Sequence, residues 1–188
     1  MSTVKATNFQ HPSSAAANIT LGSDGSVVLP AGFSGGLGTN VVQAVKSDTF
    51  STTSGTFTTV TGLEATITPS SASSKVLVIV DVNVAANNSA VLMQGRLVVG
   101  GSAIYVGDAA GSRTPSAFNS STLSNINTRQ QSIVFLHSPA TTSATTYGVE
   151  VRVSTGSGSI YVNRSYGDAD AAASPRTASS ITVVEVAA

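Results

Sequence analysis

The sequence predicts an all-β protein, an antiparallel jelly-roll-like β-sandwich that follows an extended N-terminal arm. Short runs rich in Val and Ile recur at intervals of about 8 to 12 residues, separated by Gly, Ser, Asn and Pro, which is typical of sandwiches and barrels. No window of about 12 residues places apolar side chains at helical spacing between suitable caps. The best helix seed, the alanine run at 171–173, is stopped by Pro175.

The first 40 residues differ in composition from the rest, and we assign residues 1–40 to the arm and residues 41–188 to the body. The arm is rich in Ser, Ala and Gly and closes in the Gly-rich segment 32–38, which is typical of a linker. Asp24 and Gly25 stand between the apolar runs 18–21 and 26–29, which predicts a β-hairpin. Because an isolated hairpin is marginally stable in water, it needs a surface on which to dock. The expected assembly contacts of the arm are Phe9, His11, Ile19, Leu21, Val27 and Leu29.

In the body, residues 76–84 carry Val at every second position, so these valines share one face of a strand. The other face changes from Leu77 and Ile79 to Asp81 and Asn83, which predicts burial on both sides at the start of the strand and solvent on one side at its end. Residues 147–154 alternate in the same way. Further strands are expected at residues 41–48, 57–61, 63–68, 91–99, 103–106, 130–137, 159–163 and 180–186. The last of these is expected to lie centrally, because both of its faces are apolar.

Two irregular stretches, residues 107–127 and 166–177, are too long for simple connections and are candidates for binding loops. Phe118 and Tyr166 are the aromatic side chains in these stretches, and either stacking on a sugar or packing within the protein explains them. The candidate receptor-facing residues are Arg113, Phe118, Asn119, Tyr166, Asp168, Asp170 and Arg176.

Charge and composition restrict the partners. Charged residues make up 10% of the chain, and nine basic side chains balance nine acidic ones. This balance argues against a nucleic-acid partner, which would favour a Lys and Arg excess. No run approaches the roughly 20 apolar residues of a membrane helix, so we expect no membrane partner. Because a net charge near zero removes the mutual repulsion between copies, we expect the chain to work within an assembly.

Catalytic and metal motifs are weak. Residues 32–36 match the G-x-S-x-G pattern, but no helix follows and His137, at the end of an expected strand, is the only downstream histidine. Asp81 and Glu150, on strands expected to be neighbours, are the candidates for a glycosidase pair. The chain lacks Cys, and the spacing of Asp168 and Asp170 is that of a calcium loop without its further ligands. We therefore expect no enzyme, no metal and no cofactor.

Three stretches together carry a family resemblance. They are the arm, residues 6–14 and 18–27; the opening of the body, residues 49–53, 57–63, 67–71 and 74–78; and the closing residues 179–186. This pattern resembles short fibre-like or tail-associated structural proteins of tailed bacteriophages, especially those that infect cyanobacteria and other aquatic bacteria.

The resemblance implies a homotrimer with a jelly-roll-like β body on the surface of the virion, made in the host cytoplasm. It implies that the arm anchors the chain to other virion proteins and that loops at the far end contact a host surface glycan or protein. A tail-fibre or receptor-binding element is the first expectation. A capsid decoration (cement) protein is the alternative, and a glycan-degrading spike enzyme is the third.

Overall fold

The computed structural model describes residues 8–9, 19–21, 23, 27–28, 40–87, 90–121, 127–155 and 157–187. The chain forms two compact units, Met1–Gly36 and Leu37–Ala188. The boundary between them lies within the Gly-rich segment 32–38 that the composition marks as a linker.

The first unit contains a three-stranded antiparallel sheet in the order β1–β2–β3. Its strands are β1 (Asn8–Phe9), β2 (Ile19–Leu21) and β3 (Val27–Val28). The pairing of β2 with β3 confirms the predicted hairpin, because Leu21 pairs with Val27 across the Asp24-Gly25 segment. The sequence did not indicate β1, which pairs with the other edge of β2.

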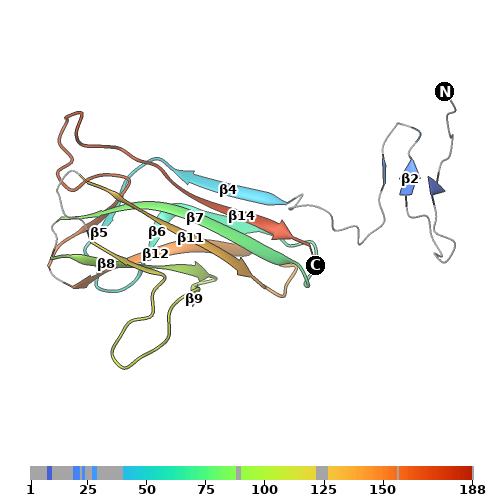
Figure 1. The fold of residues 1–188 in the computed structure, drawn as a ribbon, viewed down its shortest axis with the longest axis horizontal. Helices are drawn as coiled ribbons and strands as arrows, with labels where there is room; N and C mark the ends of the chain where they lie inside the picture. Colours follow the sequence, from blue (N-terminus) through green and yellow to red (C-terminus); the bar gives the residue numbers. More distant parts are fainter. Residues whose placement is uncertain are drawn as a thin grey trace. The chain divides into compact units, whose positions relative to one another are not determined.

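The second unit is the body, and it is the antiparallel β-sandwich that the sequence predicts (Figure 1). Its strands are β4 (Val41–Lys46), β5 (Phe50–Thr52), β6 (Thr58–Ile67), β7 (Lys75–Ala86), β8 (Leu92–Val99), β9 (Ser102–Ile104), β10 (Phe118–Ser120), β11 (Arg129–His137), β12 (Thr145–Thr155), β13 (Ile160–Val162) and β14 (Ser179–Val186). The described residues contain no helix, and hence no helix long and apolar enough to cross a membrane.

The six-stranded sheet is organised around β7, whose two edges are both paired. One edge pairs with β11, and the other pairs with β14 near its start and β13 near its end. Beyond these, β4 pairs with β14 and β5 pairs with β13. The strand β14 lies between β4 and β7, so its predicted interior position is confirmed.

The five-stranded sheet has the order β10–β8–β12–β6, with β9 also paired to β8. Because β12 occupies one edge of β8, β9 and β10 share the other edge, at opposite ends of β8. The connection between them, residues 105–117, therefore leaves the body from its side. In Figure 1 this loop extends below β9.

The core lies between the two sheets and consists mainly of β-branched side chains. Five valines of β7, at alternate positions from Val76 to Val84, are at most 1% exposed. Val149, Val151 and Val153 of β12 face them across the sandwich, as the alternation predicts. Burying a valine in this way contributes about 1.5 to 3 kcal/mol relative to an exposed one.

Two expectations about individual strands were wrong. Leu77 and Ile79 are half-buried rather than buried, whereas both faces of β7 are buried at the end of the strand, where Ala85 and Ala86 are at most 1% exposed. Residues 57–61 and 63–68 belong to one strand, β6, and not to two. Its ladder with β12 shifts register between Gly148 and Glu150, and Gly62 has a φ of 81° that glycine tolerates.

Phe118 and Asn119 lie on strand β10 and not on a loop. The Phe118 ring covers Gly95 on β8, where the missing side chain leaves room for it, and it packs against the core. Ala117 donates a 2.8 Å backbone hydrogen bond to Gly95. Of the two roles open for Phe118, its contacts are those of packing.

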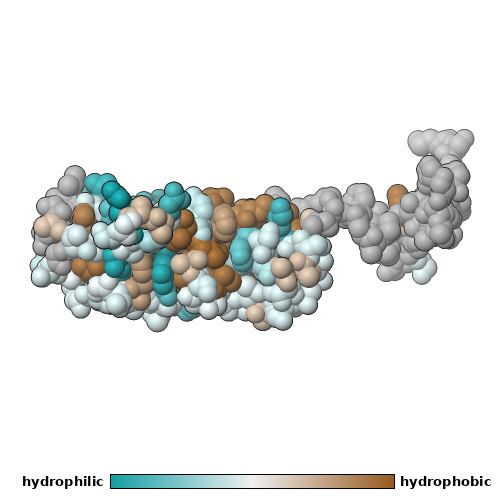
Figure 2. Space-filling model, turned by 90° about the horizontal axis from the view of Figure 1, so that it is seen from below, coloured by the Kyte–Doolittle hydropathy of each residue, from teal (hydrophilic) through white to brown (hydrophobic). Residues whose placement is uncertain are grey.

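Much of the body surface is neither strongly hydrophilic nor strongly hydrophobic. Figure 2 shows one face, on which separate brown and teal patches lie among the pale tones typical of Ser, Thr and Gly. This surface agrees with a chain that contains only 10% charged residues.

A buried carboxylate forms several hydrogen bonds at the end of the body where β4 begins. Glu185 of β14 is 5% exposed and accepts hydrogen bonds from the Ser70 hydroxyl (2.6 Å), the Ser70 amide (2.7 Å) and Asn40 Nδ2 (3.1 Å). The Glu185 amide also donates to the carbonyl of Asn40 at 2.9 Å. The Ser70 hydroxyl is the main group that lowers the pKa of Glu185 to about 2, against the opposing effect of burial.

We expect Gly95→Ala to lower the free energy of unfolding by about 1 to 3 kcal/mol, because the added methyl group would overlap the Phe118 ring. Urea titration measures the change. Gly107→Ala is the matched control, because its methyl group would meet no neighbour. Equal stability of the two variants would contradict the packing assigned to Phe118.

We expect the body to lose stability between pH 4.5 and pH 2. The folded pKa of Glu185 is lowered from 4.5 to about 2, so its stabilisation is fully present above pH 4.5 and is lost as the pH falls through this window. Glu185→Gln should lower the free energy of unfolding at pH 7 by about 1 to 3 kcal/mol and flatten this acid dependence. Glu64→Gln, at an exposed position of β6, is the control and should retain the full acid dependence.

Candidate functional site

The predicted arm contacts are only partly described. Phe9 pairs with Ile19, and Leu21 pairs with Val27, so these four residues lie in one small sheet. His11 and Leu29 lie outside the described residues. The assignment of the arm to assembly remains a prediction.

The candidate receptor-facing residues form two separate groups. Arg113 lies in the side loop between β9 and β10, where its amide and its guanidinium both donate to the Ala110 carbonyl. Phe118 and Asn119 follow on β10 in the five-stranded sheet. The second group lies in the connection between β13 and β14, which leads back to the six-stranded sheet. The side loop therefore leaves the body from its flank, and not from the far end that the sequence analysis expected for it.

We define the β13–β14 loop site as Tyr161, Arg164, Tyr166, Asp168, Asp170 and Arg176. Its connection, residues 163–178, lies at the end of the body opposite to the start of β4 (Figure 1). Asp168 has a φ of 44° and forms ion pairs with Arg164, at 2.6 Å, and with Arg176. The Asp168 carboxylate thus holds two segments of the loop together.

Tyr161 and Arg164 belong to this site although the sequence analysis missed them. The Arg164 guanidinium lies 4.1 Å from the centre of the Tyr161 ring, and the Tyr161 and Tyr166 rings are 6.0 Å apart. Tyr166 is 41% exposed, so its ring presents an open face. The signal in the sequence was an arginine at each end of the stretch that contains the two aspartates.

A hollow of about 350 Å³ lies beside these residues and is lined by Asp168, Asp170 and Arg176 together with small side chains. Its volume lies within the usual range of ligand pockets, about 300 to 1,000 Å³. Carboxylates, a guanidinium and a nearby exposed Tyr ring supply hydrogen bonds and a stacking face to a polar ligand. These groups are suited to binding a polar ligand. Because Asp168 is engaged by two arginines, the calcium-loop spacing of Asp168 and Asp170 has another explanation.

Asn163 forms the buried base of the loop site. Its side chain is fully buried, and Nδ2 donates to the carbonyls of Lys46 (2.8 Å) and Asp48 (3.0 Å). Its Oδ1 accepts from the Ser179 hydroxyl at 2.6 Å, and its backbone carbonyl accepts from the Thr177 amide. Its φ of 64° is one that Asn tolerates better than most residues. This residue fixes where the loop leaves β13 and where it returns to β14.

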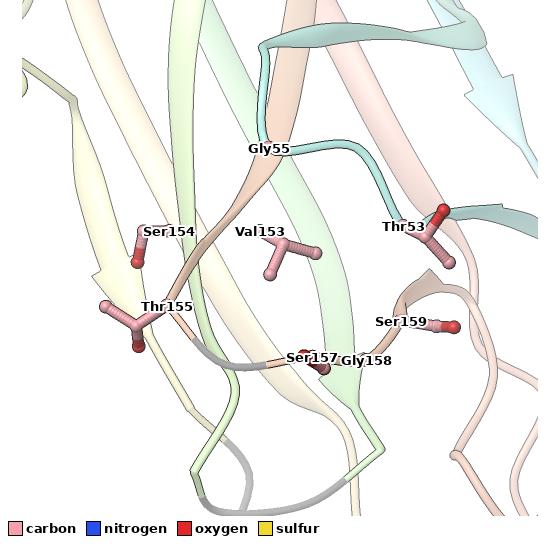
Figure 3. A pocket seen from close by; sticks show the side chains of 8 residues that line it. All are labelled: Thr53, Gly55, Val153, Ser154, Thr155, Ser157, Gly158 and Ser159. Atoms are coloured by element: carbon pink, nitrogen blue, oxygen red, sulfur yellow. The ribbon is translucent and has the colours of Figure 1, made fainter.

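A second hollow lies at the same end of the body and was not foreseen from the sequence. Figure 3 shows it between the β5–β6 connection and the turn from β12 to β13. Its volume is about 600 Å³, and it is lined by Thr53, Gly55, Val153, Ser154, Thr155, Ser157, Gly158 and Ser159. These residues offer hydroxyl and backbone hydrogen bonds but contain no ionisable or aromatic side chain.

The structure does not bring Asp81 and Glu150 together. Asp81 points outward from the six-stranded sheet and accepts from Gln130 and Ser132, whereas Glu150 points outward from the five-stranded sheet and pairs with Arg96 at 2.6 Å. They lie on opposite faces of the sandwich, so the expectation of neighbouring strands was wrong. A glycosidase needs its carboxylates within about 10 Å of each other, across one sugar.

The other chemical candidates have structural partners or lie outside the described part. His137 Nδ1 and the Tyr147 hydroxyl share a 2.9 Å hydrogen bond. Burial lowers the pKa of His137 and raises that of Tyr147 to about 12. The G-x-S-x-G residues 32–36 lie outside the described residues. No group of three or more His, Asp or Glu that could hold a metal ion occurs in the described part of the chain.

No protein-family model matches the chain, and no curated protein matches it either. The site must therefore be interpreted from its own geometry.

We expect Asn163→Asp to lower the free energy of unfolding by about 2 to 4 kcal/mol, because a carboxylate oxygen would face two buried carbonyl oxygens. It should also speed tryptic cleavage at Arg164 and Arg176. Asn119→Asp, at an exposed position of β10, is the matched control. Unchanged cleavage in the Asn163 variant would contradict its assignment as the base of the loop.

Proposed function

We propose that the chain is a structural protein of a bacteriophage particle, a trimeric tail-fibre or receptor-binding element anchored through its N-terminal arm. The family resemblance of the sequence suggests this role. The observation that supports it most directly is that the two ends of the body differ. The chain enters β4 beside Asn40 and Glu185 at one end, and the β13–β14 loop site lies at the other.

This arrangement can present the β13–β14 loop site to another surface. A sandwich whose core is closed by two sheets holds its loops at defined positions, and an attachment at one end leaves the opposite end free to meet a surface. The loop site combines an exposed Tyr166, the partly exposed Arg176 and the aspartates Asp168 and Asp170. A host surface glycan or a polar protein loop is the proposed ligand. Many weak contacts on one particle add up to firm attachment.

The described residues contain no assembled catalytic group that favours an enzyme over a binding element. The carboxylates proposed for a glycosidase lie on opposite faces, and the larger hollow offers only hydroxyl and backbone groups. The loop site engages its central carboxylate in two ion pairs. These observations support binding as the role of the far end.

The proposal predicts that fluorescently labelled full-length protein binds saturably to cells of the bacterial host. The double variant Tyr166→Ala and Arg176→Ala should lose at least tenfold in apparent affinity, which corresponds to about 1.4 kcal/mol. Tyr105→Ala with Arg129→Ala is the matched control, because Tyr105 is 47% exposed and Arg129 is exposed at the start of β11. Flow cytometry over a concentration series measures the binding.

Equal losses in the two double variants would place the binding surface elsewhere. Absence of saturable binding by the unaltered protein would overturn the receptor-binding role. Binding to fibre-free capsids in that case would favour the alternative, a capsid decoration protein.

A further inference from the structure

The outer face of the six-stranded sheet, here called the apolar face, consists of the outward positions of β11, β7, β14 and β4. Cross-strand pairing arranges them in rows. One row contains Leu136, Leu77, Val184 and Val41, and the next contains Val134, Ile79, Thr182 and Gln43. The neighbouring row contains Ser132, Asp81, Ser180 and Val45.

This face exposes large apolar side chains. Val134 is 59% exposed and Leu136 44%, while Val41 is 55% and Val45 61% exposed. The apolar residues of the face are Val41, Val45, Leu77, Ile79, Val134, Leu136, Val184 and Val186. In an antiparallel sheet with one solvated face, the outward positions are usually polar.

The opposite face of the same sandwich follows the usual rule. On the five-stranded sheet, Arg96 forms an ion pair with Glu150 and lies 4.1 Å from the centre of the Phe57 ring. Arg152 donates to Gln94 at 2.9 Å in the adjacent row. The apolar face is therefore not a general property of this hydroxyl-rich surface. It is an exception within one molecule, of the kind that marks a contact with another protein.

We propose that the apolar face is the contact between copies of this chain, in a closed ring of three whose three-fold axis is parallel to the strands. This inference rests on the proposed function, which it deepens by naming the surface that forms the trimer. The occupant of the face is a second copy of the chain.

Charge favours a second copy over a different partner. The outward positions of the four strands contain only two charged side chains, Lys75 and Asp81, which have opposite signs. Asp81 is already engaged by Gln130 and Ser132 of β11. Since the whole chain has a formal net charge of zero, copies approach without net repulsion.

The distribution of exposure favours a ring. The most exposed apolar residues lie at the two margins of the face, Val134 and Leu136 on β11 and Val41 and Val45 on β4, whereas the centre is half-buried. A two-fold pair uses one patch that meets itself, but a closed ring uses two different patches on each copy. The β11 margin of one copy then meets the β4 margin of the next.

The orientation of the strands agrees with this arrangement. When the axis of the ring is parallel to the strands, β4 begins at the same end in every copy, as attachment through the arm requires. Four strands at about 4.8 Å spacing and nine residues at about 3.4 Å per residue span a flat area of about 600 Å². A stable contact buries about 800 Å² of accessible surface per partner, so the contact must extend past the margins of the apolar face.

The oligomeric state of full-length variants tests the proposal. Sedimentation velocity at micromolar concentration should give a mass of three chains for the unaltered protein. The double variant Val134→Lys and Val45→Lys should sediment as a monomer with an unchanged far-ultraviolet circular dichroism spectrum. Val106→Lys is the matched control, because Val106 is an exposed valine (37%) outside this face, and it should remain a trimer.

Cysteine cross-linking tests the geometry, because the natural chain contains no cysteine. The double variant Leu136→Cys and Val41→Cys should form covalent trimers under mild oxidation, and neither single variant should form more than traces of dimer. Covalent dimers as the only product, or efficient dimers from a single variant, would overturn the ring.

A trimer that survives the lysine substitutions would overturn the apolar face as the contact and leave the proposed function in place. An unaltered protein that is monomeric would overturn the ring and the trimeric part of the proposal. The host-cell binding experiment decides the receptor-binding role separately, because an exposed loop binds in either state.

Discussion

The burial of the inner face of β7 is the constraint on which the rest of the body depends. Its valines at alternate positions are at most 1% exposed, and both of its edges are paired along the strand. A slip of one residue in register would turn Asp81 into the core and the valines out of it. Fixing the valines inside therefore also fixes Leu77 and Ile79 outside. The apolar face is a consequence of the same alternation that forms the core.

Charged groups are few, and several of them form hydrogen bonds or ion pairs at the two ends of the body and on one of its faces. Glu185 secures Asn40 and Ser70 where β4 begins, and Asp168 joins Arg164 and Arg176 at the other end. The ion pair of Arg96 and Glu150 lies on the outer face of the five-stranded sheet. The outer face of the six-stranded sheet is left with only two charged side chains at the outward positions of β11, β7, β14 and β4, Lys75 and Asp81, which have opposite signs.

Local alternation was sufficient to predict most strands of the body, because β-branched residues at every second position need a core on one side. It did not reveal β10, since Phe118 and its neighbours lack this pattern and their pairing depends on the room that Gly95 provides on a distant strand. Nor could it assign strands to sheets, which is why Asp81 and Glu150 were expected to be neighbours. The loop site was half predicted. Its acidic residues stood in an irregular stretch, but Tyr161 belongs to a buried strand and joins the site only through the three-dimensional contact with Arg164.

The two ends and the two faces of the body differ, and this asymmetry connects the proposals. Exposing an apolar face to water is unfavourable for an isolated molecule. The other face shows that the same kind of sheet can carry ion pairs outward instead. In the proposed ring the apolar faces lie inward, the ion-paired faces lie outward, and the starts of all β4 strands point the same way. Three copies of the β13–β14 loop site then gather at the opposite end. Each site needs only modest affinity, because a surface that offers repeated ligands engages all three together. The low charge of the chain, the apolar face and the exposed loop are then parts of one arrangement.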